Sequence, residues 1–336
     1  MTKNKTLIIA EVGVNHNGNI NVAKKLINIA KKAGCDFVKF QSFKAENLVQ
    51  SKTKIIGYQQ KNLKKKITQI DMLKNYELTE NDHKILINYC KKKKINFLSS
   101  PFDVESLKLL FNLNIFSIKI PSGEITHYIL LKQIAKRAKK VFLSTGMSNI
   151  KEIKNALSIL TGYGLKKKNI YIMHCHSDYP TKLKDVNLNA LKLIKKNFQV
   201  KVGYSDHTLG DETAIASVAM GAKVIEKHIT LEKKMIGPDH AASMEPEEFY
   251  KFVQSIRRTE VLLGSEKKEP STNEMKIKKN IRKSIVAKYK IKKGEVITEK
   301  NIISKRPEGG ISSLYWNKVI GKKAKHNFKK DDFIKF

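Results

Sequence analysis

Two histidines and two lysines carry the most evident chemistry of this chain. His207 and His228 each follow or end a short apolar run that is typical of a buried strand. Neutral imidazole binds divalent metals, and oxygen ligands can complete the coordination shell. A lone histidine at a strand end is more often a hydrogen-bonded core residue. Two on neighbouring strands favour a metal site, and carboxylates stand near them: Asp206, Glu226 and Asp239.

Lys39 and Lys119 lie inside otherwise apolar segments. Burying a lysine costs free energy unless its ammonium meets an anion. Hydroxyls and glycine-flanked amides that suit phosphate oxygens follow nearby strands, at Ser100, Ser122, Gly123, Ser144 and Gly146. These residues predict a phosphate site. The alternative is that each lysine reaches the edge of the sheet and pairs with Glu11 or Glu124.

Eight short β-branched and aromatic runs alternate with segments of helical periodicity. The expected strands are Thr6–Gly13, Phe37–Phe43, Asn96–Phe102, Phe116–Pro121, Val141–Gly146, Ile170–Cys175, Val200–Ser205 and Lys223–Thr230. The alternation of strands and helices predicts an α/β fold with a parallel sheet. Eight strand–helix units in about 260 residues favour a (β/α)8 TIM barrel over an open doubly wound sheet. The carboxyl ends of barrel strands meet at one rim, so the polar groups above are expected to converge there.

All eight expected strands end in ionisable or hydroxyl groups. A single serine or aspartate at such a point often caps the next helix. Eight polar ends on one rim are harder to explain by capping alone. On the sixth strand, His174 is expected to pack in the core, and His176 has no assigned role.

The pattern changes after a final helix, Pro246–Leu263. Residues 1–265 are expected to form the barrel, and the polar stretch 266–280 a linker. Residues 281–336 are expected to form a small β-rich domain punctuated by glycines. A domain of this size is near the lower limit for independent stability, so we expect it to lean on a partner surface.

The charge of the chain is strongly positive. Its 336 residues include 66 Lys and Arg against 31 Asp and Glu, a net charge of +35. Such an excess suggests nucleic acid or a membrane surface. The lysine runs stand beside expected strands without interleaved aromatic residues, which favours solvated helix faces and no nucleic-acid partner. A positive field would still attract an anionic substrate.

The three cysteines and the chain's first residues indicate the compartment. No Cys-x-x-Cys pair occurs, which argues against a disulfide scaffold or a thiolate zinc site. The first residues lack an apolar signal segment, and no run of 18 apolar residues is present. We therefore expect a cytoplasmic protein with no membrane partner.

Nine short motifs, in this order, resemble the sialic acid (nonulosonic acid) synthase family. They are Glu11–Gly18, Lys39–Gln41, Ser100–Phe102, Lys119–Glu124, Ser144–Met147, Tyr179–Pro180, Gly203–Thr208, Glu226–His228 and Gly237–His240. Each is short, but together they cover essentially the whole chain. The resemblance implies a transferase that condenses phosphoenolpyruvate with an N-acetylated mannose-type sugar and releases phosphate.

The resemblance also implies a role for each matching residue. Phosphoenolpyruvate would be bound by Lys39, Ser100, Lys119, Ser122, Ser144, Ser177 and Ser205. His207 and His228 would bind a divalent metal, Mn²⁺ ahead of Mg²⁺ or Co²⁺. The sugar or its protons would be handled by Glu11, Gln41, Glu124, Tyr179, Asp239 and Arg306, with Glu11, Glu124 and Asp239 as the catalytic carboxylates.

Family members have an antifreeze-like (SAF) domain after the barrel and form domain-swapped homodimers. Arg306 would accordingly reach the sugar site of the partner subunit. Two departures stand out: Ser100 occupies a position where many relatives have threonine, and residues 176–178 differ from the usual pattern before the Tyr-Pro pair.

The sugar is not determined by these motifs. The stretch 39–45 is similar to a bacterial branch that includes legionaminic acid synthases, so N,N'-diacetyllegionaminate is the favoured product and N-acetylneuraminate the next. Two other functions stay open. One is another phosphoenolpyruvate-condensing barrel or a Schiff-base aldolase that uses a lysine such as Lys119. The other is a non-catalytic module that binds a polyanion.

Overall fold

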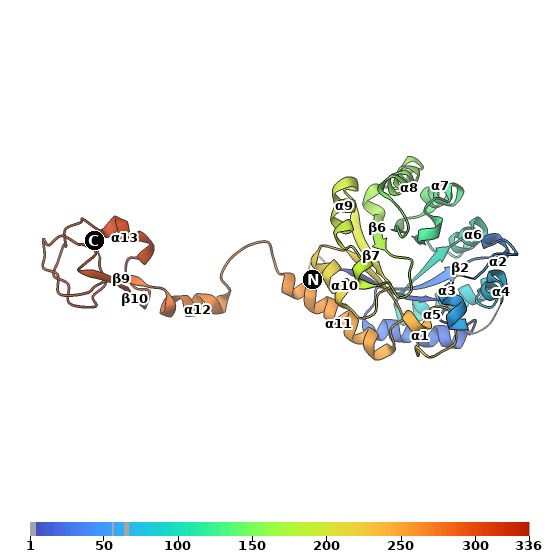
Figure 1. Cartoon of the computed structure of the whole chain (residues 1–336), viewed down its shortest axis with the longest axis horizontal. Helices are drawn as coiled ribbons and strands as arrows, with labels where there is room; N and C mark the ends of the chain where they lie inside the picture. The colour runs from blue at the N-terminus through green and yellow to red at the C-terminus, as the bar shows by residue number, and fades with distance from the viewer. Residues whose placement is uncertain (1–4, 56, 64–66, 336) are drawn as a thin grey trace. The chain divides into compact units, whose positions relative to one another are not determined.

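The computed structural model of the chain describes residues 5–55, 57–63 and 67–335. It divides into two compact units, the first ending at Gly264 and the second beginning at Ser265. Figure 1 shows the strands and helices of each unit, with a barrel in the first and a smaller, loop-rich body in the second.

The first unit is a closed barrel of eight parallel strands, in which β8 pairs with β1. Its strands are β1 Leu7–Gly13, β2 Phe37–Ser42, β3 Asn96–Pro101, β4 Ser117–Ile120, β5 Lys140–Ser144, β6 Ile170–Cys175, β7 Lys201–Asp206 and β8 Val224–His228. The (β/α)8 fold predicted from the alternation is confirmed. Each expected strand matches an observed one to within two residues at either end.

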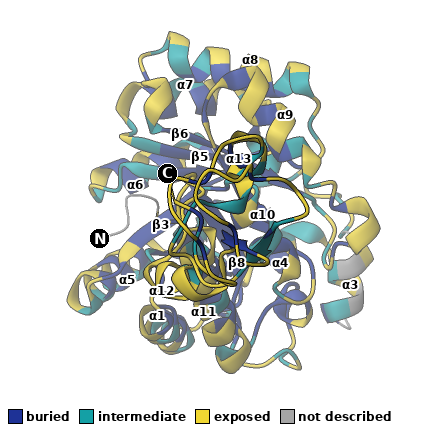
Figure 2. Cartoon of the chain, turned by 90° about the vertical axis from the view of Figure 1, so that its left-hand side faces the viewer, coloured by how far each residue is buried: buried dark blue, intermediate teal, exposed yellow. Residues whose placement is uncertain are grey.

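Helices connect successive strands and cover the outside of the barrel. They are α1 Ile20–Ala33, α5 Glu80–Lys93, α6 Val104–Asn112, α7 Tyr128–Arg137, α8 Ile150–Gly162, α9 Asn189–Phe198, α10 Glu212–Ala219 and α11 Pro246–Leu263. The connection before α5 also holds the short helices α2 Ala45–Leu48, α3 Gly57–Leu63 and α4 Gln69–Lys74. Figure 2 shows buried strands inside this unit and outer helices that expose one face. The first helix begins where the Asn19 side chain accepts from two backbone amides, and Gly34 ends it with a φ of 89°.

The interior of the barrel has two layers of different chemistry. Alternate residues of each strand point inward. The layer toward the amino ends is apolar and contains Ile9, Phe37, Leu98, Phe142, Tyr171, Met173 and Val224. Two residues further along five of these strands the side chains are polar, at Glu11, Lys39, Ser100, Ser144 and Glu226. The apolar layer thus fills the amino end, and the polar groups lie at the carboxyl ends, where TIM-barrel sites occur.

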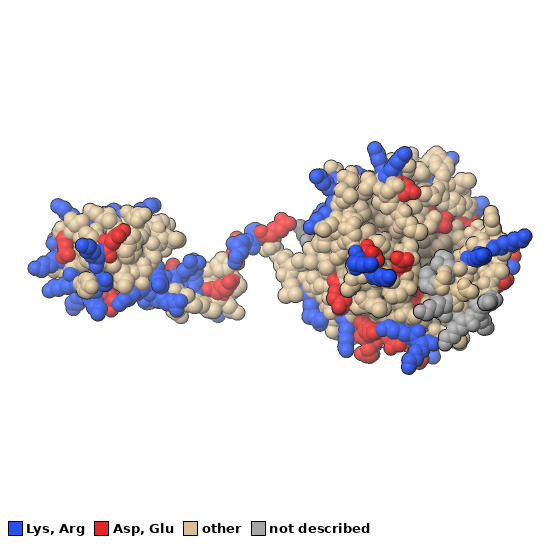
Figure 3. Space-filling model, viewed as in Figure 1, with Lys and Arg blue, Asp and Glu red and all other residues tan. Residues whose placement is uncertain are grey.

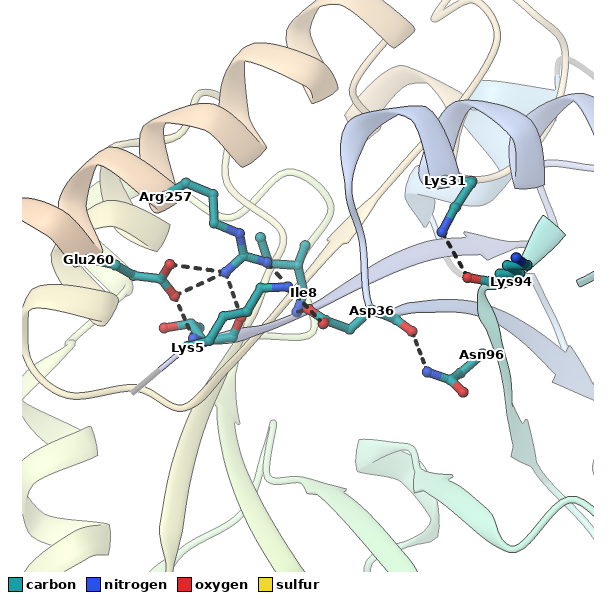
Figure 4. Close-up of polar contacts among 9 residues, drawn as sticks. Lys5, Ile8, Lys31, Asp36, Lys94, Asn96, Arg257 and Glu260 are labelled. Carbon is teal, nitrogen blue, oxygen red and sulfur yellow. Dashed lines mark hydrogen bonds and ion pairs between the residues drawn. The ribbon is translucent and has the colours of Figure 1, made fainter. Parts of the chain in front are cut away.

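A polar network lies at the amino end of β1 (Figure 4). Arg257 of α11 donates to the Thr6 carbonyl oxygen at 2.8 Å and to Glu260 Oε1 at 3.0 Å. Its guanidinium also lies 3.3 Å from Asp36 Oδ2, which accepts from the Ile8 amide at 2.9 Å. The network joins α11 to β1 and to the turn before β2.

Replacing Arg257 with methionine is expected to destabilise the barrel by about 1–2 kcal/mol, because charge-assisted hydrogen bonds are lost. The side chain is 26% exposed, so solvent screening keeps the effect modest. Thermal unfolding measures the change. Arg258→Met is the matched control, since exposed Arg258 donates only to the Ser255 hydroxyl in the described structure. Equal melting temperatures for the two variants would contradict the assignment.

The second unit is small and built around a two-stranded antiparallel sheet. It contains α12 Thr272–Ile281, β9 Ser284–Ala287, β10 Ile302–Lys305 and α13 Trp316–Val319. Its own core is formed by Ile285, Ala287, Ile291, Ile297, Ile302, Val319, Ala324, Phe328 and Ile334. Most of α12 lies in the stretch 266–280 that the polar composition predicted as a linker. A capping box of Ser271 and Glu274 starts this helix.

Charged side chains are distributed widely over the surface. On the face shown in Figure 3, Lys and Arg occur at separate places on each unit, with Asp and Glu among them. Within the described ranges, no helix is long and apolar enough to cross a membrane.

Candidate active site

A cavity of about 1000 Å³ opens at the carboxyl ends of the strands. Twelve of the residues predicted from the sequence line it: Glu11, Lys39, Gln41, Ser100, Lys119, Ser122, Ser144, Ser177, Tyr179, Ser205, His207 and His228. They come from all eight strands or the loops that directly follow them. The barrel therefore brings together residues that are up to 217 positions apart in the chain, from Glu11 to His228.

Four buried charges meet at the bottom of the cavity. Lys39 Nζ lies 3.2 Å from Glu11 Oε2 and 3.3 Å from Glu226 Oε1. Lys119 Nζ donates to the same Glu226 oxygen at 2.9 Å, as does the Ser205 hydroxyl at 3.0 Å. The pairing of a lysine with Glu11 was one of the alternatives drawn from the sequence. The shared partner of both lysines is Glu226.

Glu226 is the central site residue that sequence reasoning left without a role. It was named only as one of the carboxylates near the two histidines. The signal was nevertheless present, because residues two apart on a strand face the same side, and His228 was expected to face the cavity. The Glu226 carboxylate therefore points into the cavity, where it pairs with Lys39 and Lys119. It supplies the anion that the burial of these two lysines requires.

The electrostatics differ between the two carboxylates. Burial raises the pKa of Glu11 to about 7, against the opposing effect of Lys39. Burial acts in the same direction on Glu226, but Lys119 and Lys39 outweigh it and hold its pKa well below the usual range. Glu226 is therefore ionised at neutral pH, whereas Glu11 can hold or release a proton there. Burial also lowers the pKa of Lys119, partly offset by Glu226.

The two histidines lie next to each other at the carboxyl ends of β7 and β8. Their ring centroids are 5.4 Å apart. His207 Nδ1 donates to the His176 carbonyl oxygen, which leaves the Nε2 lone pair of His207 available. Tyr179 stacks on the His207 ring with centroids 4.0 Å apart. His176, which had no assigned role, contributes this carbonyl group.

Both imidazoles are suited to a metal. Burial lowers the pKa of His207 to about 4 and that of His228 well below its ordinary value, so both are neutral ligands at pH 7. Within the described ranges, His228 Nδ1 is buried without a hydrogen-bond partner. No group of three or more His, Cys, Asp or Glu side chains among the described residues can hold a metal alone. The donor set thus fits a metal that takes its remaining ligands from water or substrate.

Small hydroxyl residues line another part of the cavity. Ser122 Oγ accepts from the Gly146 amide at 3.0 Å and lies 3.1 Å from Cys175 Sγ. The buried Ser144 hydroxyl has no partner within the part of the chain that the structure describes. Buried polar groups are normally hydrogen-bonded, so this hydroxyl, in a cavity that two lysines also line, indicates a place for an anionic ligand.

Three predicted site residues lie away from the lining of this cavity. Glu124 accepts from His127 Nδ1 at 2.7 Å. Asp239 is buried, and burial raises its pKa to about 6. Arg306 belongs to the second unit. Their assigned roles stay predictions. His174, by contrast, donates from Nε2 to the Val186 carbonyl oxygen at 2.8 Å, as expected for a packed residue.

Comparison with known families decides the assignment. Residues 26–268 match the model of the NeuB family, and residues 282–336 match the SAF domain. This chain belongs to the NeuB family. The SAF match lies within the second unit of this NeuB-family protein and includes β9 and β10.

Relatives cover the chain nearly from end to end. It is 50% identical to the N,N'-diacetyllegionaminic acid synthase of Campylobacter jejuni, over 98% of this chain and 99% of that protein. Identity to the N,N'-diacetyllegionaminic acid synthase of Legionella pneumophila is 42%, over 95% of this chain and 90% of that protein. A crystal structure of N-acetylneuraminic acid synthetase from Leptospira borgpetersenii, with citrate, superposes with a TM-score of 0.72 and 32% identity, over 82% of this chain and 90% of that one.

Acid is expected to destabilise this NeuB-family protein below pH 6.5. Burial lowers the pKa of His16, His207 and His240 to about 4 each. Between pH 6.5 and about 4 the unfolded chain binds protons at these histidines and the folded chain does not, so stability falls as the pH falls. Each contributes about 1.4 kcal/mol per pH unit in that window. Glu11 and Asp239 offset part of this loss, because burial raises their pKa values to about 7 and about 6 and the folded chain therefore binds protons at these carboxyl groups before the unfolded chain does. Denaturant unfolding at pH 7.0 and 5.5, with EDTA present, measures the change in the free energy of unfolding. Equal free energies at the two pH values would contradict the burial of these histidines in their neutral form.

Proposed function

We propose that the protein is a nonulosonic acid synthase that condenses phosphoenolpyruvate with an N-acylated mannose-type sugar and releases phosphate. One observation carries this proposal: two buried lysines and a serine wall share a cavity with two neutral histidines. The first set suits an anionic phosphate ester, and the second suits a metal beside it. The near full-length identity to N,N'-diacetyllegionaminic acid synthases supports the same chemistry.

The lysines and hydroxyls would bind phosphoenolpyruvate. Lys39 and Lys119 supply positive charge at the bottom of the cavity, and Ser100 accepts from Lys39 Nζ at 3.2 Å. The Ser144 hydroxyl, which has no partner among the described residues, can donate to phosphate oxygens, as can Ser122 and Ser177 of the same cavity. These groups are preorganised by the strands, so substrate binding needs little reorganisation.

The histidines would hold a divalent metal, Mn²⁺ ahead of Mg²⁺ or Co²⁺, which polarises the aldehyde of the open-chain sugar as a Lewis acid. The methylene carbon of phosphoenolpyruvate then forms a bond to the aldehyde carbon, and the aldehyde oxygen takes a proton. Water adds to C2 of the pyruvyl group and loses a proton. The bond from C2 to the phosphate oxygen breaks, the C2 hydroxyl gives up its proton to become the keto group, and inorganic phosphate leaves with the bonding electron pair.

Glu11 is the described carboxyl group best placed to move a proton in this sequence. Its pKa near 7 lets it exchange a proton at neutral pH, and Gln41 Nε2 lies 3.5 Å from its Oε1. Glu124, Asp239 and Arg306 would act on the sugar, with Arg306 supplied by the partner in a domain-swapped homodimer. The SAF unit would then serve as a lid on the other subunit.

The sugar is proposed to be 2,4-diacetamido-2,4,6-trideoxymannose, with N,N'-diacetyllegionaminate as product. Relatives that are 50% and 42% identical are both named N,N'-diacetyllegionaminic acid synthases. The human relative named N-acetylneuraminate-9-phosphate synthase is 34% identical. A comparison of kcat/KM with this sugar and with N-acetylmannosamine tests the choice. A strong preference for N-acetylmannosamine would reassign the product to N-acetylneuraminate.

The activity itself is tested by phosphate release. We expect release only when phosphoenolpyruvate, the sugar and a divalent metal are all present. Activity that survives thorough chelation would remove the metal from the proposal. Tight, salt-sensitive binding to polyanions without phosphate release would favour a binding module instead.

Gly146→Ala is expected to raise the KM for phosphoenolpyruvate on the order of 10- to 100-fold, because misplaced binding groups are costly. An added Cβ would lie 2.6 Å from Ser177 Oγ and 2.8 Å from Ser122 Oγ, so both hydroxyls must shift. Steady-state kinetics with varied phosphoenolpyruvate measures the effect. Gly162→Ala is the control, because a Cβ there meets nothing within 4 Å. An unchanged KM in Gly146→Ala would exclude this wall from the substrate site.

A further inference from the structure

The two strands that carry the histidines also carry a buried ion pair on their other face. β7 and β8 run in parallel register, with Ser205 opposite Glu226 and Asp206 opposite Lys227. Ser205 and Glu226 line the cavity. Because side chains alternate along a strand, Asp206 and Lys227 point to the outside of the barrel, beneath the segment that leads to α10.

Lys227 is held by three acceptors. Its ammonium donates to Asp206 Oδ2 at 2.8 Å, to the Gly210 carbonyl oxygen at 3.0 Å and to the Thr208 carbonyl oxygen. Both members of the ion pair are 1% exposed. A lysine has three donors, so its hydrogen-bonding capacity is fully used.

Asp206 binds the same segment from the other side. Its Oδ1 accepts from the amide and hydroxyl of Thr208 at 2.9 and 2.8 Å, and its Oδ2 accepts from the Thr213 hydroxyl at 3.1 Å. The backbone of Thr208 is therefore held at its N–H by Asp206 and at its C=O by Lys227. The residues on both sides of His207 are fixed by one ion pair.

The pair acts on both imidazoles at once. Asp206 precedes His207, and Lys227 directly precedes His228. A shift of either strand end would change the spacing of the two rings. The pair therefore ties the two backbones together at the point where the histidines leave their strands.

Stability alone does not account for this arrangement. Taking two charges out of water costs free energy that their attraction barely repays, and apolar residues of similar volume often serve a fold equally well. Groups that orient a metal-binding histidine, in contrast, have a direct effect on metal affinity. We propose that Lys227 and Asp206 are positioning residues that fix His207 and His228 for a divalent metal and so set its affinity. This inference rests on the proposed function, because it takes these histidines as the ligands.

The test measures Mn²⁺ binding to the full chain by electron paramagnetic resonance, alongside thermal unfolding of each variant. Asp206→Asn alone is expected to lower the melting temperature, because it leaves a buried ammonium without its counter-charge. Asp206→Asn combined with Lys227→Met removes both charges and is expected to recover the melting temperature. The double variant is still expected to bind Mn²⁺ about 10- to 100-fold more weakly than the parent.

The combination separates positioning from folding. A double variant that regains stability and binds Mn²⁺ with the parent's affinity overturns the inference. Arg257→Met serves as the control for a double variant that stays destabilised, since Arg257 contacts the Thr6 carbonyl oxygen at the amino end of β1, away from the carboxyl ends that carry the histidines. It is expected to lower the melting temperature without weakening Mn²⁺ binding. An equal loss of Mn²⁺ affinity in this control would attribute the effect to stability and overturn the inference.

His228→Ala distinguishes this inference from the proposed function. Loss of Mn²⁺ binding in His228→Ala, together with full binding in the double variant, overturns the positioning role alone. Mn²⁺ binding that is unaffected by His228→Ala places the ion elsewhere and overturns the metal assignment of the proposed function with it.

Discussion

Replacement of His228 by alanine is expected to reduce turnover at least about 1000-fold, because Lewis-acid stabilisation supplies several kcal/mol at the developing alkoxide. His207→Ala is expected to act equally. The two rings are neutral and adjacent, so either loss leaves a single imidazole, which is insufficient to retain a metal. The measurement is phosphate release at saturating phosphoenolpyruvate, sugar and Mn²⁺.

The fold should survive these substitutions. His228 contributes no side-chain hydrogen bond from Nδ1 in the described part of the protein, so its truncation leaves no partner unsatisfied there. His326→Ala, on the exposed surface of the second unit, is a control for loss of an imidazole in general. Full activity in His228→Ala, with a melting temperature near that of the parent, would remove the histidine pair from the mechanism.

Much of this site could be predicted from one sequence, because barrel strands impose a strict period. Lys39 and Lys119 stand out as charges inside apolar runs, and the closed barrel brings both to Glu226. The strand ends, predicted from the apolar runs with the family resemblance in view, match the observed ends to within two residues. The site lysines are recognisable because a buried parallel strand tolerates a lysine only where an anion meets it.

Pairing across the barrel could not be deduced in the same way. The lysines were expected to meet a ligand or the carboxylates Glu11 and Glu124. Lys39 does pair with Glu11, but the carboxylate that both lysines share is Glu226, whose strand closes the barrel against β1. The partner of a buried charge depends on which strands are neighbours, and the local sequence pattern does not contain that information.

The outward pair of Asp206 and Lys227 shows a similar limit. Both residues stand beside the histidines in the sequence. Because side chains alternate between the two faces of a strand, these two point away from the cavity. Their contacts with the loop after β7 depend on the path of that loop. The helix α12 was missed for a different reason, since its polar composition outweighed its capping signal.

Lys119→Met is expected to lower kcat/KM for phosphoenolpyruvate between about 100- and 1000-fold. Removing this ammonium leaves Lys39 as the cation among two carboxylates, so an anionic substrate meets net repulsion. Two unit charges 4 Å apart interact by about 4 kcal/mol at an effective dielectric constant near 20, which sets the upper end of the range. Steady-state kinetics with varied phosphoenolpyruvate and fixed sugar measures it, and the KM for the sugar should change little.

The matched control is Lys140→Met. Lys140 begins β5 at the amino end of the barrel, where its ammonium lies 5.7 Å from the Phe37 ring centroid. It is expected to leave the kinetics unchanged. An equal loss of kcat/KM in Lys140→Met and Lys119→Met would show a general effect of charge and would contradict a binding site at Lys119.

One further measurement separates this prediction from the aldolase alternative, which also requires Lys119. Borohydride treatment in the presence of substrates traps a Schiff base on lysine. Lys119 Nζ donates to Glu226 Oε1 at 2.9 Å, and this ion pair opposes the lowering of the lysine pKa by burial, which disfavours attack of the amine on a carbonyl. We therefore expect no adduct. A trapped adduct on Lys119 that is absent in Lys119→Met would replace the synthase mechanism with an aldolase one.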